Sequence, residues 1–240
     1  MQSLTVGAGS SCLREHDSPR MKKTMPAIYG IALALCFFSR AILAETSTPT
    51  APATSTKTLV FLGDSLAAGL GLQPSEAFPA LIGEKIRTTG LPFQIENAGL
   101  SGDTSAGALR RIDWLLQRPI DLLVIELGAN DGLRGLPVKT LKANLQAIID
   151  KVKAKNPAVK IVIAGMQIPP NLGADYAVNF ERVYAELARE NNAVLIPFLL
   201  EGVGGHRDLN QPDMIHPTAA GHRIIADLVW RTLEPILRKG

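Results

Sequence analysis

The sequence predicts an α/β fold built on a five-stranded parallel sheet with helices on both faces. Within residues 57–240, short apolar runs alternate with amphipathic segments, the pattern of strand–helix repeats. The runs are partly β-branched and end in Gly, Asn or Pro, as strands commonly do. Five such runs favour the flavodoxin-like strand order, in which ligands bind beyond the carboxyl ends of the strands.

Five segments meet these criteria and are the predicted strands. In chain order they are KTLVFLG (57–63), FQIENAG (93–99), DLLVIELG (121–128), VKIVIAGM (159–166) and NAVLIPF (192–198). In a parallel sheet the residues that follow such strands gather at one edge, so polar residues there are the first candidates for a site.

Segments with helical periodicity lie between the predicted strands. The clearest spans residues 138–155, where apolar residues recur at helical spacing and lysines lie on the other side. A final helix is expected to open at Pro217, because proline suits the first helical position. Trp114 and Trp230 fall on apolar helical faces and are expected in the core.

Residues 1–44 are expected to be a leader that contains a signal peptide, with Met21 as its start and cleavage after Ala44. Lys22 and Lys23 follow Met21, and the apolar run 28–38 has the length of a signal h-region rather than of a membrane span. An uncleaved N-terminal anchor is the alternative, since Arg40 interrupts the approach to Ala44.

The remaining chain divides into two parts. Residues 45–56 are rich in Thr, Ser and Pro and are predicted to be a linker, and residues 57–240 are predicted to be the folded domain. Cleavage of the leader would leave no membrane span, so the expected location is the periplasm or the exterior of the cell.

Composition excludes several classes of function. Five of the 25 Lys and Arg and two of the 22 Asp and Glu fall in residues 1–44, which leaves 20 of each in the remainder. No basic patch therefore favours a nucleic-acid partner. Both cysteines, Cys12 and Cys36, lie in the leader, so the cleaved product would have neither disulfides, a thiol nucleophile nor a cysteine-bound metal.

Small and polar residues follow three of the predicted strands and precede the final helix. The segments are GDS at 63–65, LSGDTS at 100–105, GAND at 128–131 and DMIH at 213–216. Three strands and the C-terminal segment thus bring polar side chains to one edge of the predicted sheet.

These residues suit acyl transfer. A serine hydroxyl needs a neighbouring base to act as a nucleophile, and His216 can take the Ser65 proton. A carboxylate fixes the tautomer of such a histidine, and Asp213 lies three residues before His216. Backbone N–H groups of Ser65 and Gly102 and the amide of Asn130 can donate to the oxyanion of a tetrahedral intermediate.

Each piece also has a purely structural interpretation. Gly-Asp-Ser is commonly a turn, and Asp-x-x-His is as often a metal or surface pair. Asn130 and Asp131 can cap a helix, and Gly102 can be a simple turn residue. The placement of all four segments at strand ends or before the last helix favours the catalytic interpretation.

Four motifs, GDSL at 63–66, GDTS at 102–105, GAND at 128–131 and DMIH at 213–216, resemble in order those of the SGNH, or GDSL, hydrolases. The stretches NAGLSGDTSAGALRR and ELGANDGLRGLP resemble the bacterial thioesterase I, lysophospholipase and arylesterase branch of that family. The resemblance covers residues 57–240. It implies a three-layer α/β/α fold and a serine esterase or thioesterase that acts on small-molecule or lipid acyl esters without a metal or other cofactor.

The resemblance also implies a role for individual residues. Ser65 would be the nucleophile, with Asp213 and His216 as its triad partners, and Ser65, Gly102 and Asn130 would form the oxyanion hole.

The segment 166–180 follows the fourth predicted strand at the same edge and contains two prolines and a glycine. The resemblance supports a role as a wall for the acyl chain, with Ile168, Leu172 and Tyr176 as its apolar lining. A simple connection between elements is the alternative.

Several other polar residues are expected to be structural. Asp64 and Asp131 would hold loops by hydrogen bonds, and Asp103 would cap the helix near Thr104. His222 is expected at the surface or at the boundary of the core. Glu126 lies inside a strand, where a buried carboxylate needs a partner that the sequence does not identify.

Two other functions stay open. A carbohydrate deacetylase of the same family would have a short acyl site and a surface fit for sugar. A non-catalytic flavodoxin-like binding module would need a phosphate-binding loop after the first strand, and GDSLAAG is a poor version of one.

Overall fold

The computed structural model describes residues 56–239. The expected leader, with its signal peptide and its cysteines, lies outside the described residues, as does all of the expected linker except Thr56. The described residues are those of the predicted folded domain, together with Thr56 and without Gly240.

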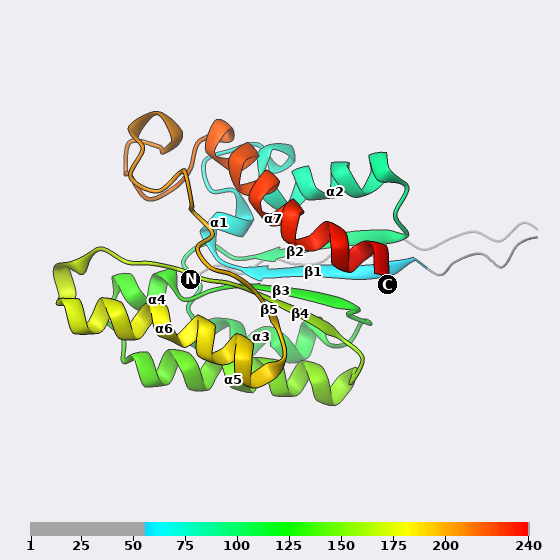
Figure 1. Ribbon diagram of the computed structural model, residues 1–240, viewed down its shortest axis with the longest axis horizontal. Coiled ribbons are helices and arrows are strands. Elements are labelled where there is room, and N and C mark those ends of the chain that lie inside the picture. Colours follow the sequence, from blue (N-terminus) through cyan, green and yellow to red (C-terminus); the bar gives the residue numbers. More distant parts are fainter. Residues whose placement is uncertain (1–55, 240) are drawn as a thin grey trace, which may run out of the picture. The chain divides into compact units, whose positions relative to one another are not determined.

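The predicted five-stranded parallel sheet is confirmed, and so is its flavodoxin-like order. The strand order is β2-β1-β3-β4-β5, and every neighbouring pair is parallel. The strands are β1 (Lys57–Gly63), β2 (Phe93–Gly99), β3 (Leu122–Glu126), β4 (Lys160–Ala164) and β5 (Val194–Ile196). Their carboxyl ends lie toward the left in Figure 1.

The last three strands are shorter than their apolar runs predict. Leu127 and Met166 are as buried as strand residues but lie beyond the paired segments. Past β4, Gly165 still donates its N–H to Ile196, after which Pro197 ends β5 without an N–H of its own. Hydrophobicity therefore marks burial, whereas the strand ends where ladder pairing ends.

Helices cover both faces of the sheet, so the three-layer α/β/α architecture is confirmed. The helix pair α2 and α7 lies on one face, and α3, α5 and α6 lie on the other (Figure 1). The bounds are α1 (Ser65–Ala68), α2 (Phe78–Thr89), α3 (Ser105–Leu115), α4 (Ala129–Leu133), α5 (Val138–Lys155), α6 (Ala174–Asn191) and α7 (Ala219–Lys239). Short 3₁₀ turns are η1 (Pro74–Glu76), η2 (Pro170–Leu172) and η3 (Arg207–Leu209). Within residues 56–239, no helix has the length and apolar character needed to span a membrane.

The predicted helix 138–155 matches α5, but the expected start of the final helix at Pro217 is wrong. α7 begins at Ala219. Pro217 instead forms an antiparallel bridge with Asn210, and the Thr218 hydroxyl accepts the N–H of Gly221 at 3.4 Å. Pro217 is thus part of the loop before the helix. Thr218 accepts a backbone N–H from the first turn of α7, as a capping residue does.

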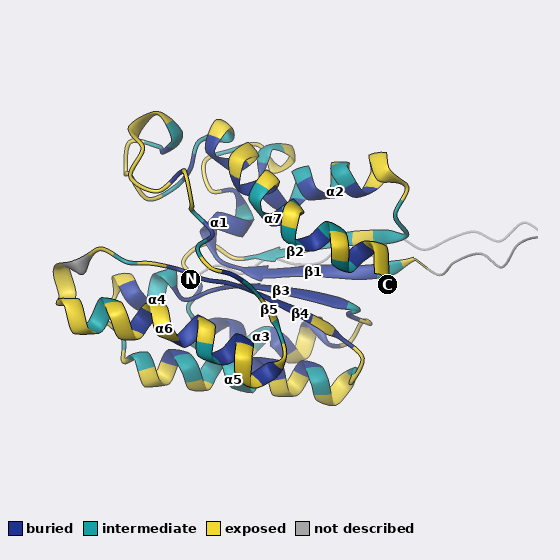
Figure 2. Cartoon of the chain, in the orientation of Figure 1, coloured by how far each residue is buried: buried dark blue, intermediate teal, exposed yellow. Residues whose placement is uncertain are grey.

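The core lies between the sheet and the inner faces of the helices, as Figure 2 shows. β3 is buried along its whole length, and β1 along all of it except its first residue. The expectation that Trp114 belongs to the core is wrong, because its side chain is 61% exposed and lies under the Arg118 guanidinium, 5.4 Å from the ring centre. Ala108, Ile112 and Leu115 supply the buried face of α3 in its place.

Candidate active site

The structure brings Ser65, His216 and Asp213 together at the carboxyl edge of the sheet. His216 Nε2 lies 2.9 Å from Ser65 Oγ, and His216 Nδ1 lies 2.6 Å from Asp213 Oδ2. Ser65 and His216 are separated by 151 positions in the chain. This geometry can pass the serine proton to the imidazole while the carboxylate holds the ring and its tautomer.

Ser65 is the first residue of the short helix α1, directly after β1. Asp64 caps this helix, because its Oδ1 accepts the N–H of Leu66 at 3.0 Å. The N–H groups of Asp64 and Ala67 donate to Glu126 Oε2, both at 3.1 Å. The first N–H groups of a helix have no acceptor within the helix. The carboxyl groups of Asp64 and Glu126 accept other N–H groups, so the Ser65 N–H is left for another acceptor.

Asp213 builds a tight turn around the histidine. Its Oδ1 accepts the N–H groups of Ile215 and His216 at 2.9 and 3.0 Å, while its Oδ2 faces the imidazole. The turn forces Met214 to a φ of 60°, which is uncommon for a residue with a side chain. The hydrogen bonds from His216, first of its side chain and then of its backbone, lower the pKa of Asp213 to about 2. Asp213 is therefore a carboxylate at neutral pH.

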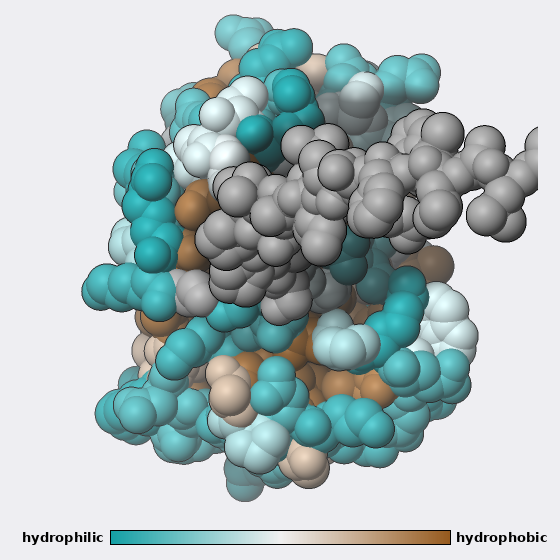
Figure 3. All heavy atoms as spheres, turned by 90° about the vertical axis from the view of Figure 1, so that its right-hand side faces the viewer, coloured by the Kyte–Doolittle hydropathy of each residue, from teal (hydrophilic) through white to brown (hydrophobic). Residues whose placement is uncertain are grey.

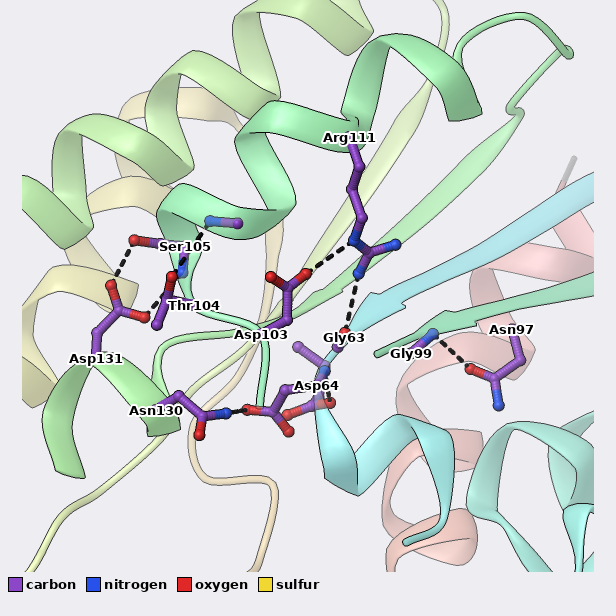
Figure 4. Close-up of polar contacts among 12 residues, drawn as sticks. Gly63, Asp64, Asn97, Gly99, Asp103, Thr104, Ser105, Arg111, Asn130 and Asp131 are labelled. Atoms are coloured by element: carbon purple, nitrogen blue, oxygen red, sulfur yellow. Dashed lines mark hydrogen bonds and ion pairs between the residues drawn. The ribbon is translucent and has the colours of Figure 1, made fainter. Parts of the chain in front are cut away.

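The loop with Gly102 is held by two arginines. Gly102 adopts a φ of +79°, a conformation that favours glycine, and its carbonyl accepts a hydrogen bond from Arg134 at 3.0 Å. Arg111 joins Asp103 at 2.8 Å to the Gly63 carbonyl at 3.1 Å (Figure 4). These bonds tie the loop to the end of β1, beside the serine.

Asp103 is not the cap of α3, contrary to the sequence prediction. Thr104 caps the helix by accepting the N–H of Gly107 at 3.2 Å, and Asp103 pairs with Arg111. Asp103 and Thr104 are adjacent, but the Asp103 carboxylate is taken by Arg111, about two turns into the helix.

Asn130, at the start of α4, points toward the turn that carries Asp64 and Ser65. Its Nδ2 donates to Asp64 Oδ2 at 3.1 Å (Figure 4), and an amide nitrogen has a second hydrogen to offer. The neighbouring Asp131 accepts both the N–H and the hydroxyl of Ser105 at 2.8 and 2.5 Å. The loop-holding roles expected of Asp64 and Asp131 are thus confirmed.

Glu126 is the site residue that sequence reasoning left without a partner. It is the last residue of β3, is fully buried, and faces Gly63 across the sheet. The only signal in the sequence was a carboxylate inside an apolar strand, and the partners are backbone N–H groups, which a sequence pattern does not reveal.

The segment after β4 lies over α4. Ile168 packs close to Gly132, and the Leu172 side chain approaches Gly135. The Tyr176 hydroxyl donates to the Leu136 carbonyl at 2.6 Å. The three predicted lining residues therefore gather around the element that positions Asn130, with Leu172 the most exposed.

His222 is buried, which corrects the expectation that it lies at the surface or boundary. Its Nδ1 accepts the N–H of Phe78 at 3.0 Å, and the two rings stack. Burial lowers the pKa of His222 to about 4, so the ring is neutral at pH 7 and serves as a hydrogen-bond acceptor for α2.

Residues 56–239 contain no group of three or more His, Cys, Asp or Glu side chains arranged to hold a metal ion. The carboxyl edge holds a serine hydroxyl, an imidazole and a carboxylate in hydrogen-bonding series, with the Asn130 amide bonded to Asp64 beside them, and this arrangement suits acyl transfer.

A hollow of about 810 Å³ lies at the opposite, amino edge of the sheet. Its lining includes Lys57, Phe93, Asp121 and Val194, from the first residues or the approaches of the strands. Figure 3 looks onto this side of the molecule, where hydrophobic residues are framed by hydrophilic ones. The lining of the hollow includes no histidine, serine, threonine or cysteine, so chemistry rather than cavity size locates the candidate site.

Comparison with known proteins agrees with the chemistry at the carboxyl edge. The GDSL-like lipase/acylhydrolase family model matches residues 61–224. Esterase TesA of Pseudomonas aeruginosa is 43% identical over 183 residues, which cover 75% of this chain and 90% of the esterase.

Two further proteins resemble the chain. Escherichia coli thioesterase 1/protease 1/lysophospholipase L1 is 36% identical over 186 residues, which cover 77% of this chain and 87% of that protein. The crystal structure of psychrotrophic esterase EstA from Pseudoalteromonas sp., inhibited by monoethylphosphonate, matches with a TM-score of 0.72 and 37% identity. It covers 76% of this chain and 99% of EstA.

Proposed function

The chain belongs to the GDSL-like lipase/acylhydrolase family of ester hydrolases, and on this premise we propose that it cleaves acyl esters through Ser65, His216 and Asp213. One observation supports the proposal above the others. Three side chains with the chemistry of a serine nucleophile, a base and an orienting carboxylate lie in hydrogen-bonding series, at 2.9 and 2.6 Å.

The first half of the reaction forms an acyl-enzyme. Ser65 Oγ attacks the ester carbonyl carbon while its proton moves to His216 Nε2. The carbonyl oxygen becomes an oxyanion, and the imidazolium is stabilised by the Asp213 carboxylate. When the tetrahedral intermediate collapses, the bond to the leaving oxygen or sulfur breaks, and that atom takes the proton from His216.

The oxyanion needs donors that are already oriented. We assign this role to the backbone N–H groups of Ser65 and Gly102 and to the Asn130 amide. Asn130 is supported by its bond to Asp64, which holds one amide hydrogen and leaves the other to turn toward the oxyanion. The Ser65 N–H is supported by its place in the first turn of α1.

The second half of the reaction hydrolyses the acyl-enzyme. His216, neutral again, takes a proton from water, and the hydroxide attacks the acyl carbon. The same donors receive the second oxyanion, and the bond to Ser65 Oγ breaks as the serine regains its proton. The products are a carboxylic acid and free enzyme.

The substrates are acyl esters or thioesters, and the acyl chain is proposed to lie against Ile168, Leu172 and Tyr176. These residues pack over α4, beside the proposed oxyanion donor. Relatives named esterase and thioesterase/lysophospholipase support this class of substrate. A deacetylase acting on sugar esters is the second candidate and would use the same proposed triad.

We infer that the enzyme is exported and acts in the periplasm or outside the cell. The support is the sequence of residues 1–44, with Lys22 and Lys23 before an apolar run of signal length. Intact mass of protein recovered from an exporting host is expected to fit a chain that starts at Glu45. A mature chain that starts at Met1 or Met21 would overturn the inference.

A fluorophosphonate probe tests the mechanism. The enzyme is expected to be labelled, and Ser65→Ala is expected to lose the label while keeping its fold. Hydrolysis of p-nitrophenyl esters from acetate to palmitate then separates the candidates, since a deacetylase would be confined to acetate. Labelling that persists in Ser65→Ala would show that another residue is the nucleophile.

A further inference from the structure

Two buried carboxyl groups lie directly beneath the proposed nucleophile. Asp64 and Glu126 are both fully inaccessible to solvent. Glu126 Oε2 accepts the N–H groups of Asp64 and Ala67, which bracket Ser65 in the chain, and Asp64 accepts from Leu66 and Asn130. The mechanism proposed above gives Glu126 no task, although it is tied to the serine's own turn.

The glycine before Asp64 makes room for this arrangement. Gly63 pairs with Glu126 across the sheet, and a Cβ at Gly63 would lie 2.4 Å from Glu126 Oε2 and 2.5 Å from the Ala67 Cβ. A side chain of any kind would therefore displace the carboxyl group or the helix. The Gly-Asp-Ser motif thus carries a glycine where the Glu126 carboxyl group must fit.

Glu126 accepts the N–H groups of Asp64 and Ala67, which are among those that the start of a helix leaves without an acceptor. Its Oε1 has no hydrogen-bond partner within residues 56–239, so only the two N–H groups on Oε2 would compensate a full negative charge. Burial, and then the nearby Asp64, raise the pKa of Glu126 well above its ordinary value. Burial also raises the pKa of Asp64 to about 6, although bonds from Leu66 and Asn130 oppose this.

The groups around Asp64 and Glu126 also bear on which of the two carboxyl groups is ionised. His216 favours the charged form of Asp64, whereas Asp103, itself paired with Arg111, opposes it. Within the described residues, the hydrogen bonds to Glu126 come from backbone N–H groups and not from a basic side chain, and Tyr184 lies nearby as a neutral phenol. One proton on Glu126 and a charge on Asp64 is the arrangement that these neighbours favour.

We propose that Glu126 is a positioning residue for the hydrolysis, a neutral carboxylic acid that clamps the turn bearing Ser65 through the N–H groups of Asp64 and Ala67. This inference deepens the proposed function and rests on Ser65 as the nucleophile. The clamp fixes the Gly63–Asp64 and Leu66–Ala67 peptide groups, one before and one after the serine, so the Ser65 hydroxyl meets His216 and its N–H stays available for the oxyanion. Asp64, fixed by the same clamp, in turn orients the Asn130 amide.

Three substitutions of Glu126 separate this role from others. Glu126→Gln keeps a neutral acceptor at the position of Oε2 and is expected to keep most of kcat. Glu126→Asp keeps an ionisable group but retracts it by one methylene, so it cannot hold both N–H groups and kcat is expected to fall. Glu126→Leu removes the clamp, and kcat is expected to fall by about 10²-fold with KM little changed, the scale of a 1 Å misplacement.

The order of the variants decides between mechanisms. A neutral clamp predicts that Gln exceeds Asp in kcat, whereas a required negative charge predicts that Asp exceeds Gln. If Glu126→Leu does not fold, the comparison of Gln with Asp still tests the proposal. Each kcat should be calculated from the concentration of enzyme that reacts with the fluorophosphonate probe, so that unfolded protein is not counted as enzyme.

Asp121 provides the matched control at the other edge of the sheet. Its Oδ2 accepts the N–H of Thr58 at 2.7 Å, and it lies far along the strands from Ser65. Asp121→Asn and Asp121→Leu are expected to leave kcat unchanged, whatever they do to the midpoint of thermal unfolding.

Failure of this inference is distinguishable from failure of the proposed function. If Ser65→Ala is inactive and Glu126→Leu keeps its kcat, only the clamp is overturned. If Gln falls as far as Leu while Asp retains activity, the carboxylate must be charged, and the neutral clamp is overturned. If Ser65→Ala retains activity and labelling, the nucleophile itself is wrong.

Discussion

At the amino edge of the sheet Asp121 accepts the N–H of Thr58, and at the carboxyl edge Glu126 accepts those of Asp64 and Ala67. Both are carboxyl groups that satisfy backbone donors. Asp121 is part of the lining of a hollow that includes no serine, threonine, cysteine or histidine, whereas Glu126 lies beneath a serine that contacts a histidine. The same bond therefore stabilises the fold at one edge and is proposed to position chemistry at the other.

The two edges also differ in what their open space contains. The amino edge has a hollow of about 810 Å³, and its charged side chains come mainly from lysines on strand starts and helix ends. The carboxyl edge concentrates polar atoms that are already directed by neighbours, such as Asn130 by Asp64 and Asp213 by its own turn. Directed donors and acceptors, rather than volume, distinguish the candidate site.

The largest expected effect comes from the nucleophile. Ser65→Ala should lower kcat on the order of 10⁶-fold, and the double variant with His216→Ala should lose little more, because triad members act as a unit. Ser75→Ala, an exposed serine of η1, serves as the control and should be fully active. Steady-state rates on a p-nitrophenyl ester measure this. Additive losses in the double variant would contradict a shared mechanism.

The proposed oxyanion donor should have a smaller effect of a different kind. Asn130→Ala leaves Ser65 and His216 intact and removes one donor, which costs about 10²–10³ in kcat. Because the oxyanion exists only in the transition state, KM should change little and probe labelling should continue. Normal kcat with a much raised KM would instead make Asn130 a contact to the bound substrate.

His222 tests the claim that a buried histidine outside the candidate triad acts on stability. Its pKa is lowered from 6.5 to about 4 in the folded protein, so the unfolded chain binds the proton more readily between these values. Stability is fully present above pH 6.5 and falls toward pH 4, by on the order of 3 kcal/mol. Chemical unfolding across this pH range measures it.

His222→Gln is the comparison for that titration. Its amide oxygen can accept the Phe78 N–H without titrating, so the loss of stability between pH 6.5 and 4 should shrink. An unchanged pH dependence in this variant would show that another group is responsible for the loss.

The acyl-chain wall is expected to give the smallest effect. Leu172→Asn should lower kcat/KM for palmitate esters by about tenfold relative to acetate, because one exposed apolar contact is lost. Val194→Asn, at a similarly exposed residue of β5 at the opposite edge of the sheet, is the matched control and should not change the ratio. An equal loss on both esters with Leu172→Asn would indicate general damage rather than a lost acyl contact.

Much of the fold was predictable from periodicity alone. The strands β1 and β2 and the helix α5 match their predicted bounds, because in each the apolar pattern ends where the regular structure ends. Three of the errors, at Leu127, Met166 and Trp114, have a common cause. Leu127 and Met166 continue the apolar pattern beyond β3 and β4, and Trp114 is an apolar residue that the packing leaves outside, so hydrophobicity alone misassigns them.

The residues of the candidate site could be selected from the sequence, but the network of bonds around them could not. The motifs identify Ser65, Asn130 and His216, and parallel topology explains why they meet at one edge. The partners of Glu126 and His222 are backbone N–H groups of Asp64, Ala67 and Phe78, and every residue has such a group. Only the path of the chain determines which of them faces a buried side chain.

The central claim is that Ser65 is the nucleophile, and mapping the site of phosphonylation tests it most directly. The protein is reacted with a fluorophosphonate, digested and analysed by peptide mass spectrometry. We expect one adduct per chain, on Ser65, and none in His216→Ala at the same probe concentration and time. An adduct on another serine, or stoichiometric modification of Ser65→Ala, would contradict the assignment.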